Sequence, residues 1–305
     1  MKGLIIKSTG LWYEAKVEDK VLIARLRGKF KLEDKKLTNP IAVGDWVEVE
    51  PNNQVDGEWV IVDIYPRKNY VVRQSPRKKG HDHMLASNID QGVLIVTLKK
   101  PRTSVGFIDR FLITLEAFRI PGIIIFNKED LYTEKERKLY EELKAIYSTI
   151  GYSVHLISLK EENPLHKLPA LFEGKVTLIS GHSGAGKSTL VNLLSPDARQ
   201  EINEVSDFAN KGVHTTTFAE LFEVDSKASI IDTPGIKELG LSEIDDDELS
   251  HYFPEMRQYL GACKFHNCIH ENEPGCAIKA EVGNAISWRR YESYISILSN
   301  EDNRK

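Results

Sequence analysis

The stretch "GHSGAGKS", Gly181 to Ser188, satisfies the spacing G-x-x-x-x-G-K-[ST] of a phosphate-binding loop. The apolar run "KVTLIS" precedes it, and "KSTLVNLL", which overlaps its end, is predicted to form a helix. Glycines let the backbone N–H groups of such a loop turn towards phosphates, at a helix N-terminus whose dipole favours anions. Because strand, loop and helix occur together, the sequence predicts a nucleotide-binding loop rather than a chance glycine-rich turn.

The loop supplies most of the predicted nucleotide contacts. Lys187 is expected to reach the β and γ phosphates, and Ser188 is expected to ligate Mg²⁺. The predicted nucleotide-binding residues of the loop are Gly181, His182, Ser183, Gly184, Ala185, Gly186, Lys187, Ser188 and Thr189.

Two elements downstream are expected to complete the phosphate site. "SIIDTPG" places Asp232 and Gly235 at the end of an apolar strand, in the D-x-x-G arrangement expected to hold the water shell of the magnesium and contact the γ phosphate. The polar stretch "GVHTTT" lies between the phosphate loop and this strand and is the predicted first switch. Thr215 or Thr216 is expected to complete the magnesium shell, and the sequence does not decide between them.

Base recognition is predicted in "IIIFNKEDL", Ile123 to Leu131, where an N-K-x-D pattern follows an apolar strand. The carboxylate of Asp130 can accept hydrogen bonds from both N1–H and the exocyclic amine of guanine, a donor pair that adenine lacks. Ligand crevices of open parallel sheets lie at the carboxyl ends of the strands, where this pattern falls. The predicted base-side residues are Asn127, Lys128, Glu129 and Asp130, with Ser158 and Leu159 of a second loop after the strand "LISL".

The order of these elements is unusual, because the base-recognition pattern normally follows the phosphate loop. Here it comes about fifty residues before that loop. If the ends of an ordinary GTPase were joined and the chain reopened after the second switch, the elements would occur in the order found here. The sequence therefore predicts a circularly permuted GTPase domain.

Composition limits the class of protein. The chain has 305 residues and 41% hydrophobic content, enough for two or three compact domains with real cores. It contains no apolar run of the length that a membrane helix needs and no apparent signal peptide, so we expect a cytoplasmic protein without membrane contact. The net charge is −4, yet residues 1–80 hold 16 Lys and Arg against 11 Asp and Glu.

The chain divides into four predicted parts. Residues 1–68 contain five short β-type runs, which suggest a small barrel, and residues 69–88 form a basic, proline-containing linker. Residues 89–242 alternate strands and helices, as in a parallel sheet covered by helices. Residues 243–305 pass through a cysteine cluster into a predicted helix, "AEVGNAISWRRYESYISILSN", residues 280–300.

The three cysteines suggest a metal site rather than a disulfide framework. With one imidazole they give the spacing C-x4-C-x-H-x5-C at Cys263, Cys268, His270 and Cys276. Three thiolates and a histidine make the closed tetrahedral set typical of one structural Zn²⁺. His266 is an alternative imidazole within the same stretch.

Over essentially its whole length, the chain resembles the circularly permuted GTPases of the RsgA/YjeQ type, which depend on the small ribosomal subunit. The order of the nucleotide elements carries this resemblance, together with "ASNIDQ", "GFIDRFL", "GVHTTT" and the cysteine spacing. It implies an N-terminal OB barrel, a permuted GTPase domain and a mostly helical C-terminal zinc domain, and it favours His270 over His266. Two departures are "SLK", where many GTPases have Ser-Ala-Lys, and Ile236, where many have a water-orienting glutamine.

The resemblance implies hydrolysis of GTP to GDP and phosphate during late maturation of the small (30S) ribosomal subunit, stimulated by that subunit. Ile236 cannot polarise water, so another group must take the glutamine's role. His214, beside the switch threonines, is the local candidate, and the resemblance also points to it. A neutral imidazole there could orient the attacking water.

Binding of ribosomal RNA is expected for the same reason. The basic stretches "ARLRGKFK" and "SPRKKG", with Trp12 and Tyr13, would give the barrel a basic and aromatic surface, and Arg289 and Arg290 add charge near the C-terminus. We expect a monomer. Two alternatives stay open on the residues alone, a P-loop phosphotransferase acting on a small molecule and a nucleotide-gated RNA-binding module with negligible turnover.

Overall fold

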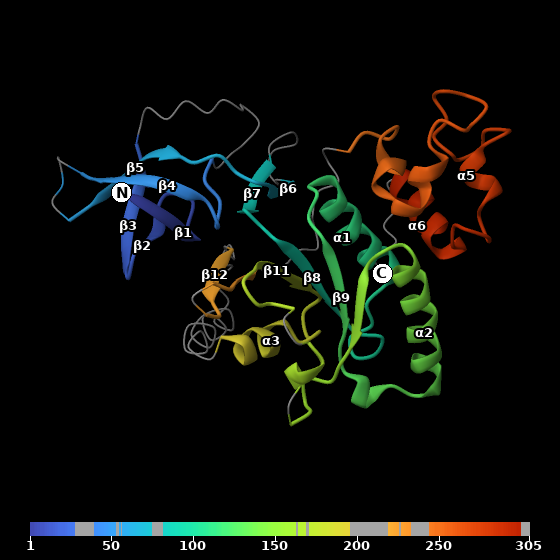
Figure 1. Cartoon of the computed structure of the whole chain (residues 1–305), viewed down its shortest axis with the longest axis horizontal. Coiled ribbons are helices and arrows are strands. Elements are labelled where there is room, and N and C mark those ends of the chain that lie inside the picture. The colour runs from blue at the N-terminus through green and yellow to red at the C-terminus, as the bar shows by residue number, and fades with distance from the viewer. Residues whose placement is uncertain are drawn as a thin grey trace.

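The computed structural model describes residues 1–27, 40–52, 55, 57–74, 82–162, 164–168, 171–195, 219–225, 227–232 and 244–299. Its centre is an 11-stranded sheet that runs from an open α/β layer into a barrel, in the order β10-β9-β8-β11-β13-β12-β1-β2-β3-β5-β4. Figure 1 shows the barrel and the C-terminal helices on opposite sides of the α/β layer.

Five strands form the N-terminal barrel, as the sequence predicted. Strand β1 pairs with both β2 and β4, and this double pairing closes the barrel. Alternate side chains point inward and are buried, including Ile5, Ala15 and Ile61. The barrel strands are β1 (Lys2–Ser8), β2 (Tyr13–Val17), β3 (Lys20–Leu26), β4 (Trp46–Pro51) and β5 (Trp59–Ile64).

The predicted linker, residues 69–88, contains two paired antiparallel strands, β6 (Tyr70–Gln74) and β7 (Asp82–Ser87). A polar cluster joins this hairpin to the barrel. Buried Asp45 accepts hydrogen bonds from Arg67 and from Ser87, whose Oγ lies 2.5 Å from the carboxylate. The backbone N–H of Ser87 donates to the carbonyl of Val43 at 2.9 Å. The connection between the barrel and the central layer is thus held by specific contacts.

The central layer has the predicted parallel sheet with helices on both faces. Side chains of β8 and β9 alternate between the two faces, because successive residues of a strand point in opposite directions. One face packs against helices α1 and α2, and the other packs against α3. The elements are β8 (Gln91–Val96), α1 (Val105–Ala117), β9 (Gly122–Phe126), α2 (Glu134–Thr149), β10 (Ser153–Leu156), β11 (Val176–Gly181), α3 (Lys187–Leu194), β12 (Glu220–Glu223) and β13 (Ser229–Asp232), with short 3-10 helices η1 (Glu129–Leu131) and η2 (Pro164–Lys167).

This topology places the predicted nucleotide elements at one edge of the sheet. Strands β10, β9, β8, β11 and β13 are parallel, so their carboxyl ends meet at the same edge. The base-recognition residues follow β9, the second base loop follows β10, and the phosphate loop follows β11. Permutation therefore changes the chain order of these loops without separating them in space.

The C-terminal region packs its own small core against α1 through Ile113. A helix was predicted over residues 280–300. The helix in the structure, α6, is shorter and begins at Trp288. Gly283 has a φ of +88°, and Val282 pairs with Ile286, so a turn occupies the first part of the predicted helix. The elements are η5 (Leu249–Tyr252), η6 (Pro254–Tyr259), α5 (Ala277–Ala280) and α6 (Trp288–Leu298). Among the described residues, no helix has the length and apolar character needed to cross a bilayer.

Candidate nucleotide site and metal centre

Two glycines of the phosphate loop are required by close approaches. Gly181 has a φ of +150°, and a Cβ there would lie 2.3 Å from the carbonyl oxygen of Ile95. Gly186 has a φ of +113°, and a Cβ there would lie 2.3 Å from Nδ2 of Asn127. A side chain at either position would force the loop away from β8 or from the base-recognition loop.

Asn127 connects three loops of the site. Its side chain is buried, with only 2% of its surface exposed. Nδ2 donates to the carbonyl of Ala185 in the phosphate loop at 2.8 Å, and Oδ1 accepts from the backbone N–H of Leu159 in the second base loop at 3.1 Å. The amide has a donor and an acceptor on one small group, so it can fix both neighbouring loops at once.

The carboxylate of Asp130 is held by the second base loop. The Ser158 hydroxyl donates to Asp130 Oδ1 at 2.6 Å, and Ser158 itself is buried. Lys128 adopts a left-handed backbone conformation, with a φ of +66°, and its Nζ donates to the carbonyl of Lys100 at 2.5 Å. These contacts fix the orientation of two residues of the N-K-x-D pattern.

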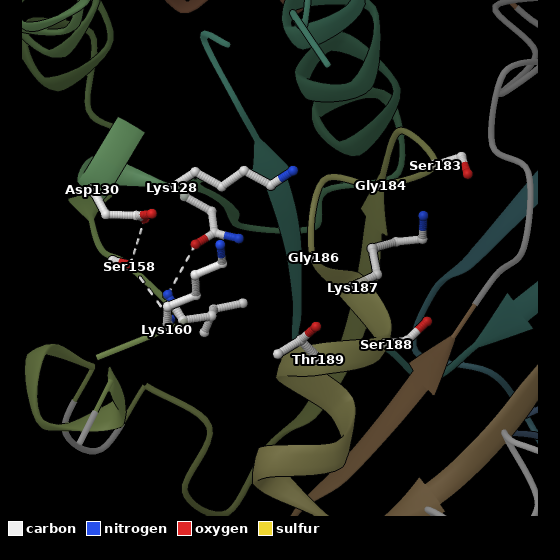
Figure 2. A pocket seen from close by; sticks show the side chains of 12 residues that line it. Lys128, Asp130, Ser158, Lys160, Ser183, Gly184, Gly186, Lys187, Ser188 and Thr189 are labelled. Carbon is white, nitrogen blue, oxygen red and sulfur yellow. Dashed lines mark hydrogen bonds between the residues drawn. The ribbon is translucent and has the colours of Figure 1, made fainter. Parts of the chain in front are cut away.

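The two sets of loops enclose a cavity of about 380 Å³. Figure 2 shows the base-side residues Asp130, Ser158 and Lys160 on one side and the phosphate loop, from Ser183 to Thr189, on the other. Lys160 lines the cavity although it was not among the predicted residues; its position as the third residue of "SLK" was the available signal. The lining comprises Asn127, Lys128, Asp130, Ser158, Leu159, Lys160, Ser183, Gly184, Gly186, Lys187, Ser188 and Thr189.

Lys187 is partly buried beneath the loop. Its Nζ donates to the carbonyl oxygens of Gly181 at 2.6 Å and His182 at 3.3 Å. Burial lowers the pKa of Lys187, and the nearby carboxylate of Asp232 opposes that shift. Asp232 ends β13, next to β11, the strand that leads into the phosphate loop.

The remaining predicted nucleotide residues fall into two groups. Glu129, Gly181, His182 and Ala185 are described but do not line the cavity, and the Glu129 carboxylate instead pairs with Arg137 at 3.2 Å. His214, Thr215, Thr216 and Gly235 lie outside the described residues.

The four predicted metal ligands lie together in the C-terminal region. One ligand atom from each of Cys263, Cys268, His270 and Cys276 lies within 4.8 Å of the others. Nδ1 of His270 is 3.6 Å from Sγ of Cys263 and 3.4 Å from Sγ of Cys276. Burial lowers the pKa of His270, which favours the neutral imidazole that a metal ligand requires. This donor set fits a metal ion, with His270 rather than His266 in the group.

Two tyrosines of α6 support the metal-binding loop. The Tyr291 hydroxyl donates to the carbonyl of His270, and the Tyr294 hydroxyl donates to the carbonyl of Ile269, both at 2.7 Å. The backbone N–H groups of Ala277 and Lys279 point at Sγ of Cys263 and Cys276, at 3.4 Å each. Such outer contacts orient the ligands and stabilise thiolate charge.

The structure corrects two expectations about RNA-facing residues. Tyr13 belongs to the barrel core and is 2% exposed, whereas its neighbour Trp12 stacks on the guanidinium of Arg25 at 3.6 Å. Arg290 is 1% exposed and forms ion pairs with Asp109 at 2.6 Å and Glu255 at 2.7 Å. Both side chains have structural partners inside the protein, so neither faces solvent.

A further cationic and aromatic cluster lies on the barrel surface. The ammonium group of Lys2 is 4.5 Å from the ring centre of Trp46 and 5.1 Å from that of Tyr65. Trp46 is 40% exposed although it is a large aromatic residue. The second half of the basic stretch "ARLRGKFK" and all of "SPRKKG" lie outside the described residues.

Two family models match the chain. The RsgA GTPase model matches residues 64–242, and the RsgA N-terminal domain model matches residues 2–58.

Similar proteins and structures cover the whole chain. A protein of Cytophaga hutchinsonii described as small ribosomal subunit biogenesis GTPase RsgA is 52% identical over 100% of both chains. A protein of Phocaeicola vulgatus with the same description is 45% identical over 100% of this chain and 98% of its own. The crystal structure of YjeQ from Thermotoga maritima matches with a TM-score of 0.74 and 32% identity, over 100% of this chain and 99% of that one. The structure of YloQ, described as a circularly permuted GTPase, matches with a TM-score of 0.72 and 31% identity, over 100% and 96%.

Proposed function

The chain belongs to the RsgA family of GTPases, and we propose that it hydrolyses GTP to GDP and phosphate in the biogenesis of the small ribosomal subunit. The observation that carries this proposal is the cavity between the base-recognition loops and the phosphate loop, which Asn127 ties together. A site that fixes base and phosphate loops relative to each other selects for a whole nucleotide rather than for phosphate alone.

Guanine recognition is assigned to Asp130. Its carboxylate, fixed by Ser158, would accept hydrogen bonds from N1–H and the exocyclic amine of guanine. Lys128 and Lys160 line the same side of the cavity and would pack along the base. On the other side, the backbone N–H groups from Ser183 to Thr189 would bind the phosphates, and Lys187 would move from the loop carbonyls to the β and γ phosphates.

Magnesium would be held by Ser188 and Asp232, with Thr215 or Thr216 completing the set. Bound there, Mg²⁺ neutralises charge on the phosphates. His214 is assigned the role of orienting the attacking water, because Ile236 occupies the position where many GTPases have glutamine. An imidazole on a loop needs that loop to be ordered, so we expect slow turnover alone and faster turnover on the ribosomal subunit.

Zinc is assigned to Cys263, Cys268, His270 and Cys276. Three thiolates and one imidazole leave no open position, which is the arrangement of a structural rather than a catalytic metal. The bound ion would hold the loop to α5 and α6 and stabilise a region with a small core.

The partner is assigned as the small ribosomal subunit and its RNA, in the cytoplasm, with the protein acting as a monomer. The description shared by the relatives from Cytophaga hutchinsonii and Phocaeicola vulgatus supports the small subunit as partner. The barrel offers exposed Trp46 beside Lys2, and Trp12 beside Arg25, the combination of aromatic and cationic groups that binds RNA.

The direct test is GTP hydrolysis by the purified protein alone, with isolated small subunits, and with large subunits as the control. Stimulation confined to small subunits is the expected result. Unchanged turnover despite tight GTP binding would contradict the partner assignment and favour a nucleotide-gated module. Where small subunits stimulate the wild-type protein, His214→Ala should abolish the stimulated turnover while leaving GDP affinity unchanged.

A second test concerns the base. Asp130→Asn should exchange guanine preference for xanthine preference, because the carboxamide can donate where the carboxylate accepts. Competition of GTP and XTP for hydrolysis by the variant measures the change. A variant that loses activity with both nucleotides, or keeps its preference for GTP, would contradict the role of Asp130.

A further inference from the structure

Helix α1 contacts two regions that the proposed function treats separately. Phe107, in its first turn, faces the phosphate loop, and Asp109, two residues later, faces the C-terminal region. Figure 1 shows α1 between the central strands and the C-terminal helices. Because these positions share one helical turn, a displacement at one of them moves the other.

Phe107 stacks on the phosphate loop. Its ring centre lies 4.0 Å from that of His182, with an angle of 28° between the planes. Phe107 is 5% exposed and packs into the core between α1 and the sheet, so the position of its ring is fixed. His182 follows Gly181 directly, at the start of the loop. The stack therefore supports the loop at a point distinct from the hydrogen bond between Asn127 and Ala185.

The C-terminal region fixes the orientation of α1 through a buried charge cluster. Arg290 of α6 donates to Asp109 at 2.6 Å and to Glu255 at 2.7 Å. The Tyr147 hydroxyl of α2 donates to the same oxygen of Asp109 at 2.8 Å. The side chains of Arg290 and Asp109 are almost fully buried, with 1% and 0% exposed, so bulk solvent screens their attraction little.

We propose that Phe107 is a positioning residue for the phosphate loop, and that Arg290 sets its position through Asp109 and α1. The inference rests on the proposed nucleotide site. His182, the stacking partner of Phe107, does not line the cavity, yet the nucleotide affinity depends on the stack through the shape of the loop. The C-terminal region thereby influences nucleotide binding through α1.

The first test is a double-mutant cycle in GDP affinity, using Phe107→Leu, His182→Ala and the double variant. Each single change should weaken GDP binding about 2- to 10-fold, the range expected for one aromatic pair. The double variant should bind GDP no less tightly than the single variant that has the lower affinity. Phe111→Leu is the matched control, because Phe111 lies one turn further along the same buried helix face and should lose stability without losing affinity. Additive effects, or an equal loss in Phe111→Leu, would overturn the role of Phe107.

The second test follows the link to Arg290. Asp109→Asn should weaken GDP binding in the wild-type background and have no further effect in Phe107→Leu. Tyr147→Phe should weaken GDP binding less, because it removes one hydrogen bond to Asp109 and leaves the ion pair with Arg290 in place. Each variant is assayed at a temperature where its near-ultraviolet circular dichroism shows a folded chain. Wild-type affinity in folded Asp109→Asn and Tyr147→Phe would overturn the link.

The two hypotheses fail in different ways. Wild-type protein that binds neither GDP nor GTP would overturn the proposed function together with the inference. Wild-type protein that binds GDP with the same affinity as Phe107→Leu would overturn the inference alone.

Discussion

The barrel and the C-terminal region are attached to the central layer by different kinds of contact. The barrel combines backbone pairing with side-chain contacts: β1 pairs with β12, Ser87 N–H donates to Val43, and the Asp45 carboxylate accepts from Arg67 and the Ser87 hydroxyl. The C-terminal region is joined by side chains, with Arg290, Arg257 and Arg289 paired to carboxylates of α1 and α2 or of its own fold. Backbone contacts tolerate substitution, whereas a buried ion pair makes the attachment depend on single residues far apart in the chain.

Metal removal should have the largest effect, and only on the C-terminal region. We expect a zinc chelator to abolish amide protection in residues 244–299, a local loss of about 5 kcal/mol or more, because metal binding to such a site is coupled to folding. The barrel should keep its protection. Hydrogen exchange with and without chelator measures both regions at once, and restored protection on adding Zn²⁺ but not Mg²⁺ is the control. Equal protection in both samples would show that the small core suffices without a metal.

Arg290→Met should have the next largest effect. It leaves Asp109 and Glu255 buried without their cation, which typically costs about 3–5 kcal/mol of unfolding free energy. Arg289→Met is the matched control on the same helix. Its pair with Glu142 is exposed, so that variant should lose less than about 1 kcal/mol. Urea unfolding measures the unfolding free energy of both variants. Similar losses would mean that the buried cluster around Arg290 contributes no more to stability than the exposed pair of Arg289.

The roles of these two arginines show what a sequence can and cannot reveal. Adjacent in "RRYESY", they look equivalent, and both were expected to face RNA. Arg290 is buried because Asp109, 181 residues earlier, meets it in the folded chain. Such a contact leaves no local pattern. The loops around Asn127 and Gly181 were predicted because their chemistry depends on short spacings, and the strand before Asn127 was predicted because a run of apolar residues is a local signal.

Local signals also explain the errors in secondary structure. The helix predicted over residues 280–300 included Gly283, which lies in a turn with positive φ. Residues 69–88 were predicted to be a linker because they are basic and contain prolines. In the structure, β6 and β7 form an antiparallel pair within this stretch. Strand pairing between segments of a polar, basic stretch depends on the neighbouring barrel, which composition does not reveal.

Gly44→Ala should weaken the contact between the barrel and the β6–β7 hairpin. Gly44 has a φ of +94°, and a Cβ there would lie 2.3 Å from the carbonyl oxygen of Ser87. Gly57→Ala is the matched control, because Gly57 has a φ of +81° but a Cβ at that position would meet nothing within 4 Å among the described residues. We expect both variants to lose stability because alanine is strained in a left-handed conformation. Gly44→Ala should lose about 1–3 kcal/mol more unfolding free energy, because its Cβ also displaces the backbone of Ser87. Thermal unfolding measures the stability of both variants. Equal losses of stability would show that the backbone around Gly44 and Ser87 can move to accommodate the Cβ.

The surface ion pairs between the barrel and β12 should matter least. Lys7 lies 2.9 Å from Glu220, and Lys16 lies 2.5 Å from Glu223. Both pairs are partly exposed, so water and salt screen them, and each of Lys7→Ala and Lys16→Ala should cost less than about 1 kcal/mol. That cost should vanish at high salt, whereas the loss in Gly44→Ala should persist, because steric contact is not screened. If either lysine variant lost more than about 2 kcal/mol in urea unfolding, side chains rather than backbone pairing would hold the barrel to β12, and the contrast between the two attachments would fail.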